Sequence, residues 1–194
     1  MRNIAKILIL PAALAALPAA AQEREPFTGP SVVVIGGVDH ASGGGFKDTG
    51  VLYGGAATYD LGAGKLRYGV EAEVTGSTKK GCQTSVVVAN DRACSETGRD
   101  FYVGGRLGAV VSDNVMIYGK AGYTNARLSS SYDTPATTVN PDSSSAGNNG
   151  GYRLGAGVEY NMGKFVARTE YRFSDYNGIV GSRHQGTVGL GLRF

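Results

Sequence analysis

The sequence has few of the residues on which helical proteins and most enzymes depend. Its 194 residues include no Trp, two His and two Cys, only 18% are charged, and 31 are Gly. Glycine is therefore present at about twice its usual share, and strong helix formers are sparse after the first twenty residues, which argues against a helix bundle and favours an all-β chain. No later stretch approaches the roughly 20 consecutive apolar residues of a helical membrane span, a test that does not exclude a membrane β-barrel.

Residues 1–21 have the pattern of a cleaved signal peptide. Arg2 and Lys6 precede the apolar run 7–17, and small residues lead up to Ala21. An N-terminal membrane anchor is the alternative, but the apolar run is short for a span. Cleavage after Ala21 would leave 173 residues with 17 basic and 16 acidic side chains. This near-neutral charge argues against nucleic-acid binding, and export predicts an oxidising compartment.

The two cysteines lie close together in a polar segment. We expect Cys82 and Cys94 to form one disulfide that closes a loop, which the chain-entropy picture values at roughly 3 kcal/mol. Two free thiols or a metal-binding pair are the alternatives, and a metal pair would need further His or Cys nearby.

Strict alternation of apolar and polar residues is the main structural signal. It runs clearly through 66–75, 152–161, 165–174 and 185–194, and more weakly through 51–60, 101–111 and 115–124. A β-branched run from Ser31 to Asp39 adds an eighth strand, whose phase the sequence does not fix. The connections alternate between tight turns and longer polar loops over 40–50, 77–99, 125–150 and 175–183. The sequence therefore predicts an all-β fold, an eight-stranded antiparallel up-and-down transmembrane β-barrel with extracellular loops, rather than a soluble sandwich.

Charged residues occupy the polar face of these strands. In a small barrel in lipid that face points inward, so we expect the charges to form a salt-bridge network that plugs the lumen. A narrow selective conduit and, for a sandwich, a solvated sheet face are the alternatives. The predicted lumen charge network comprises Arg67, Glu71, Glu73, Arg106, Lys120, Arg153, Glu159, Arg168, Glu170 and Arg172.

Aromatic residues on the apolar face lie near strand ends. Their spacing matches two interfacial girdles around an apolar band of about 25 Å. The predicted girdles comprise Tyr53, Tyr59, Tyr68, Phe101, Tyr123, Tyr152, Tyr160, Phe165, Tyr171 and Phe173.

The last third of the chain resembles a known family. The segments 166–176 and 186–194 are similar to the final hairpin of small outer-membrane β-barrel proteins of Gram-negative bacteria, namely the OmpA-like transmembrane domain, OmpX and opacity-protein relatives and alphaproteobacterial porin-family surface antigens. The resemblance implies that Leu190, Leu192 and Phe194 form the signal read by the barrel assembly machinery. Two departures are the lack of an aromatic at Pro30 or Ser31 and the absence of a peptidoglycan-binding domain after Phe194.

The resemblance and the pattern together predict the organisation and role of the chain. We expect a signal peptide over 1–21, a periplasmic segment over 22–29 and a monomeric barrel over 30–194 in the cell outer membrane, in contact with lipid and lipopolysaccharide. The expected role is envelope integrity and surface contact as an adhesin or antigen, with a host or phage ligand bound through the loops. A narrow porin or small-ligand receptor, for example for haem, is the alternative.

Residues for catalysis are scarce. We expect no enzyme, no catalytic residues, no cofactor and no metal site. His40 and His184 fall on strands that become neighbours when the barrel closes, so a paired site for a metal or haem at the outer rim is geometrically allowed, although isolated histidines are the simpler interpretation. A lipid A acyl hydrolase using Ser182 and His184 is a remote alternative, because no acidic residue on that strand face orients the imidazole.

Overall fold

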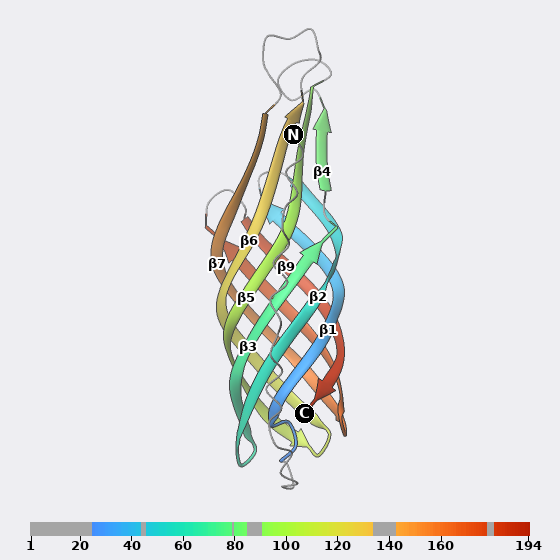
Figure 1. Cartoon of the computed structure of the whole chain (residues 1–194), viewed down its shortest axis with the longest axis vertical. Helices are drawn as coiled ribbons and strands as arrows, with labels where there is room; N and C mark the ends of the chain where they lie inside the picture. Colours follow the sequence, from blue (N-terminus) through green and yellow to red (C-terminus); the bar gives the residue numbers. More distant parts are fainter. Residues whose placement is uncertain (1–24, 44–45, 79, 85–90, 134–142, 178–180) are drawn as a thin grey trace, which may run out of the picture.

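Eight antiparallel strands close into a barrel, and a short ninth strand lies outside it (Figure 1). The computed structural model describes residues 25–43, 46–78, 80–84, 91–133, 143–177 and 181–194, and contains no helix within these ranges that could span a membrane. The strands are β1 (Gly29–Gly43), β2 (Phe46–Ala63), β3 (Leu66–Ser77), β4 (Lys80–Thr84), β5 (Arg92–Ser112), β6 (Val115–Asp133), β7 (Ser143–Met162), β8 (Phe165–Tyr176) and β9 (Gly181–Arg193).

The barrel closes by two non-sequential pairings. Strand β1 pairs with β9, and β3 pairs with β5. All other neighbours in the wall are consecutive antiparallel strands of the up-and-down kind, apart from β4, which pairs only with β5. The predicted fold class is therefore confirmed.

Alternation in the sequence becomes an inside and an outside in the structure. Along β3 the charged side chains of Arg67, Glu71 and Glu73 are buried in the barrel, whereas Tyr68 and Val70 are exposed. A period of two places successive side chains on opposite faces, so the apolar face meets lipid and the polar face fills the interior. A sandwich would place the same two faces the other way round.

Pairing with β9 settles the phase of the first strand. Val33 and Ile35 are buried at 4% and 2% exposure, whereas Val34 is 74% exposed. Strand β1 thus has apolar side chains on both faces near its start, which is why its sequence reads as a β-branched run rather than an alternation. Asp39, at the far end of the same inner face, is fully buried.

The two ends of the barrel differ. At the turn end, tight turns join β2 to β3, β5 to β6 and β7 to β8, with Gly64 and Gly163 in the positive-φ region that favours glycine. At the opposite, distal end the strands run far beyond the predicted boundaries. Much of the predicted loops 40–50, 77–99, 125–150 and 175–183 is strand, a correction to the predicted strand ends. Backbone pairing continues above the lipid, where no alternation is required because both faces of the sheet meet water.

Three wall strands extend at the distal end and form a protruding sheet together with β4. It consists of β4 with the distal parts of β5, β6 and β7, paired over 80–84, 92–97, 126–132 and 143–149. Figure 1 shows β5, β6 and β7 rising past the other strands with β4 beside them. Strand β7 pairs with β6 from Ser143 but with β8 only from Gly151. One edge of the protruding sheet therefore faces no other strand within the described residues.

Candidate functional site

The barrel interior is a dense array of charged side chains. All ten residues of the predicted lumen network are buried, at 5% exposure or less. Counted over the described residues of the wall, seven buried Asp or Glu side chains face eight buried Arg or Lys side chains, and the eighth cation, Arg67, lies beside the carboxylate of Glu25, so the charge is balanced. A buried charge without a partner is strongly unfavourable, and this balance is what makes the arrangement stable.

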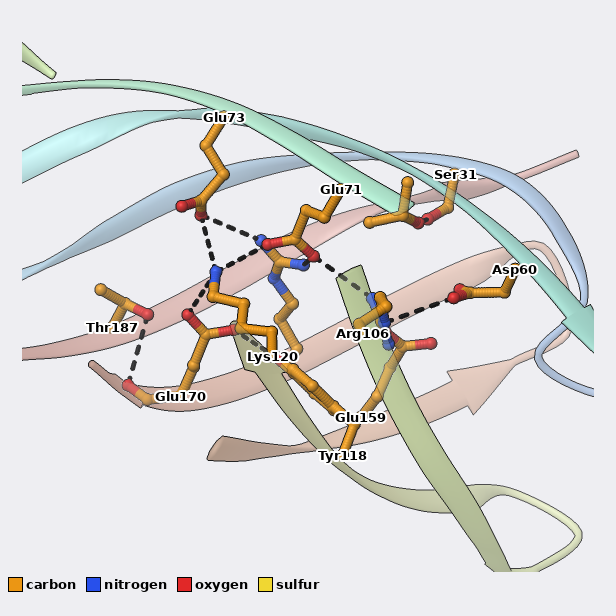
Figure 2. A network of polar contacts seen from close by, with 12 residues as sticks. Ser31, Asp60, Glu71, Glu73, Arg106, Tyr118, Lys120, Glu159, Glu170 and Thr187 are labelled. Carbon is orange, nitrogen blue, oxygen red and sulfur yellow. Dashed lines mark hydrogen bonds and ion pairs between the residues drawn. The ribbon is translucent and has the colours of Figure 1, made fainter. Parts of the chain in front are cut away.

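Lys120 lies at the centre of the array. Its Nζ is 2.7 Å from Glu71 Oε1, 2.8 Å from Glu170 Oε1 and 3.2 Å from Glu73 Oε2, and all four side chains are 0% exposed (Figure 2). The ammonium also lies 4.7 Å from the centroid of the Tyr102 ring, within cation–π range. Three carboxylates from β3 and β8 thus converge on one ammonium of β6.

Two arginines of β8 complete the central layer. Arg168 Nη1 is 2.8 Å from Glu71 Oε2, and Arg172 Nη2 is 2.7 Å from Glu73 Oε2. Arg172 Nε donates to Glu170 Oε1, whose other oxygen accepts a hydrogen bond of 2.7 Å from the Tyr118 hydroxyl. The planar guanidinium donates in several fixed directions, so Arg172 bridges carboxylates on two strands, Glu73 on β3 and Glu170 on β8.

A lower layer lies toward the turn end. Arg106 Nη2 is 2.9 Å from Glu159 Oε2, and its Nε is 3.3 Å from Asp60 Oδ1. Arg193 Nη2 approaches the other oxygen of Glu159 at 2.6 Å. A longer contact of 3.4 Å from Arg106 Nη1 to Glu71 joins this layer to the central one.

An upper layer lies toward the distal end. Arg153 Nη2 is 2.6 Å from Asp100 Oδ2, and its Nη1 is 3.1 Å from Glu73 Oε1. Arg183 pairs with Asp39 and lies 3.3 Å from Asp100. Ion pairs and hydrogen bonds therefore run without interruption from Asp39 through all three layers.

The sequence prediction missed five charged members of this network: Asp39, Asp60, Asp100, Arg183 and Arg193. The available signal was position along the strand, because residues an even number of positions apart point to the same face. Asp100 shares the phase of Arg106 on β5, and Arg183 shares the phase of Arg193 on β9. The strands expected over 101–111 and 185–194 begin just after Asp100 and Arg183, and the sequence does not fix the phase of β1, which contains Asp39.

The turn end is capped by the residues before β1. Phe27 is fully buried beside Met116 and Tyr118, at a φ of 64° that is unusual for a residue other than Gly. Arg67 donates through Nε to the Pro26 carbonyl at 2.8 Å and lies 3.5 Å from the carboxylate of Glu25. Residues 25–28 of the predicted periplasmic segment thus close one end of the interior, and 1–24, with the predicted signal peptide, lie outside the described residues.

The outer surface carries the predicted aromatic residues. Nine of the ten are exposed, at 44% to 61%, and Phe173 is half-buried against the ring of His184. Tyr59 and Tyr160 lie toward the turn end, and Tyr53 and Tyr152 toward the distal end. Tyr59 is six positions after Tyr53, about 20 Å along the strand.

The protruding sheet contains the disulfide. Cys82 and Cys94 are directly opposite each other on β4 and β5 and are joined by an S–S bond. On the neighbouring strand the Tyr132 hydroxyl donates a hydrogen bond of 2.7 Å to Asp91, and this bond raises the pKa of Tyr132. The disulfide is as predicted, but it bridges two paired strands rather than closing a loop without secondary structure.

The last strand ends at the seam with β1. Leu190, Leu192 and Phe194 are all exposed on the outer face, and the Phe194 N–H donates to the Pro30 carbonyl at 2.9 Å. His184 lies at the distal end of the same strand, directly opposite His40 on β1. Its Nδ1 is 2.6 Å from the Tyr171 hydroxyl, so in the Ser182–His184 pair the imidazole is oriented by a phenol rather than a carboxylate.

The closed barrel and its interior can be compared with known families. The family model described as outer membrane protein beta-barrel domain matches residues 9–194. The chain belongs to this family. As a member of the outer-membrane β-barrel domain family, the protein lies in the outer membrane, as the sequence predicted.

Solved structures share the fold of this outer-membrane β-barrel domain at low identity. Ail, the attachment invasion locus protein of Yersinia pestis, solved with the heparin analogue sucrose octasulfate, has a TM-score of 0.56 and 17% identity over 86% of this chain and 99% of its own. Neisserial surface protein A has a TM-score of 0.53 and 17% identity over 86% and 98%. The comparison with curated proteins gives no match.

Proposed function

We propose that this outer-membrane barrel is a closed structural element that carries a contact surface outside the cell. The closed interior is supported by the burial of Lys120 at ion-pair distance from three carboxylates, with all four side chains 0% exposed: Glu71, Glu73 and Glu170. A water-filled conduit would solvate its lining charges, whereas here the charges pair with one another. The proposed role of the interior is therefore to plug the lumen and hold eight strands in register.

The contact surface outside the cell is supported by the protruding sheet. Residues 144–148 of β7 are exposed; they include no charged side chain and no apolar side chain larger than that of Ala. Arg99 on β5 and Arg127 on β6 are also exposed. Ahead of Gly151, β7 pairs with β6 alone among the described residues, and its other edge presents main-chain donors and acceptors to an extended partner. Loops and hairpins above the membrane are where such barrels meet other molecules, so we assign adhesive or antigenic contact with a host or phage surface to this sheet.

Single-channel recording of refolded parent protein and of Glu170→Ala tests the closed interior. We expect no stable conductance from the parent. Glu170→Ala removes one carboxylate from Lys120 and Arg172, and we expect intermittent leaks and a lower unfolding midpoint in detergent. Stable conductance of the parent, together with an unchanged midpoint in Glu170→Ala, would favour a narrow porin instead.

A shortened hairpin tests the contact surface. Replacing residues 129–146 by Asn-Gly would join the register partners Leu128 and Gly147 by a two-residue turn and leave the wall unchanged. Because Ail was solved with a sulfated sugar, sucrose octasulfate is the first soluble probe, followed by adhesion of displaying cells to an epithelial monolayer. We expect the shortened variant to lose adhesion while keeping its outer-membrane level; equal adhesion of both proteins would argue against the assignment.

A further inference from the structure

The two histidines of the chain meet on the outer surface of the barrel. His40 and His184 are 144 residues apart in sequence, but closure of β1 onto β9 makes them register partners. Directly opposite residues of antiparallel strands share a face and have Cβ atoms about 4.5 to 5.5 Å apart. Their sequence neighbours Asp39, Arg183 and Gln185 are buried inside, whereas His40 is exposed and His184 partly exposed. Both imidazoles therefore lie on the outer face.

Each imidazole is held through the same ring nitrogen. His184 Nδ1 is 2.6 Å from the Tyr171 hydroxyl, and His40 Nδ1 is 3.1 Å from Thr49 Oγ1. A neutral imidazole that donates from Nδ1 to a hydroxyl oxygen keeps its lone pair on Nε2. Among the described residues neither Nε2 has a hydrogen-bond partner.

The rings are also held by packing. The Phe173 ring lies 5.2 Å from the His184 ring and the Tyr171 ring 6.2 Å from it, measured between centroids. Metal-binding histidines usually have their second nitrogen engaged in this way, because the bond fixes both tautomer and ring orientation. The pair therefore has the partners of a ligand site rather than those of two independent surface histidines.

We propose that His40 and His184 chelate one divalent transition-metal ion, Zn²⁺, Cu²⁺ or Ni²⁺, through their two Nε2 atoms. Imidazole nitrogen suits these metals, and the side-by-side position on paired strands allows both rings to reach one ion. No cluster of three or more His, Cys, Asp or Glu suited to a metal occurs in the described ranges, so water would complete the coordination. Such an open site binds reversibly and differs from a closed structural zinc site.

The test is a metal titration of untagged, refolded protein in detergent, in which these are the only histidines. We expect one Zn²⁺ per chain by calorimetry, and a Cu²⁺ electron paramagnetic resonance spectrum showing two nitrogen ligands. His40→Gln and His184→Gln should each show one nitrogen and lose at least about tenfold in affinity, and Tyr171→Phe should lose about tenfold through the lost Nδ1 partner. The heat-dependent gel shift of a folded barrel serves as the folding control for each variant.

A second measurement uses the parent protein alone. Bound Zn²⁺ should protect both imidazoles from acylation by diethyl pyrocarbonate, counted by mass spectrometry.

Two outcomes of the metal titration would overturn the proposal. One is a parent that binds no more metal than the double variant His40→Gln/His184→Gln. The other is single variants that keep the parent's affinity, which would mean that the two histidines act independently.

Discussion

The barrel wall and the protruding sheet are parts of the same long strands, yet different forces stabilise them. In the wall, buried ion pairs fill most of the interior and the outer side chains face lipid. In the protruding sheet, Ser144, Ala146 and Asn148 are exposed, and a disulfide joins β4 to β5. The comparison teaches that strand pairing alone does not require alternation. Alternation is imposed where one face meets lipid and the other a closed interior.

The largest expected effect concerns assembly of the wall. Deleting Phe194 removes the exposed aromatic that directly follows β9 and the backbone donor to Pro30 at the seam. We expect the chain to be lost from the outer membrane and to appear as periplasmic aggregate or fragments, measured by fractionation and immunoblotting. The shortened protruding hairpin is the matched control and should assemble. A normal outer-membrane level after the deletion would show that β9 needs no terminal aromatic.

The next largest effect concerns the interior. Lys120→Met leaves Glu71, Glu73 and Glu170 without their shared ammonium, and removing one partner from a buried pair typically costs about 3 to 5 kcal/mol. Equilibrium unfolding in urea with detergent or vesicles measures the free energy. Lys164→Met, at an exposed turn position, should change it by about 0.5 kcal/mol or less. Equal values for the two variants would mean that the interior charges are hydrated.

A matched pair of arginine substitutions compares the outer face of the wall with the protruding sheet. Val34→Arg places a charge on the lipid face, where Val34 is 74% exposed, and should cost about 2 to 4 kcal/mol. Ser145→Arg places the same side chain on the exposed part of β7 and should cost about 0.5 kcal/mol or less. Unfolding from vesicles measures both. Similar costs would imply that lipid does not contact Val34 on β1, or that it reaches the distal part of β7 at Ser145.

The smallest effect on global stability concerns the disulfide. Cys82→Ser/Cys94→Ser should leave the unfolding midpoint of the barrel unchanged, because the constraint of roughly 3 kcal/mol acts on the short β4–β5 hairpin. Trypsin should cut faster between Ser77 and Arg99, while the wall resists, as followed by mass spectrometry. A lower unfolding midpoint of the barrel would show that the disulfide also stabilises the wall.

The sequence predicted the wall well and the distal end poorly, for the same physical reason. The strand expected over 66–75 is observed as Leu66–Ser77, and that expected over 165–174 as Phe165–Tyr176. Strands β6 and β7 instead continue through Ser, Gly and Asn residues that read as loop, because nothing in water selects an apolar face there. The sequence also does not predict which charged side chains form ion pairs inside the barrel, because that depends on which strands face each other across the interior.

The cap at the turn end determines where a label can be attached. Phe27 is enclosed beside Met116 and Tyr118, and Glu25 and Pro26 contact Arg67, so the chain enters β1 already fastened to the opposite wall. Tight turns of such barrels face the periplasm. An epitope or fluorescent protein fused directly ahead of Glu25 would therefore report from the periplasmic side, and topology mapping from the cell surface needs insertions near the tip of β6 and β7 instead.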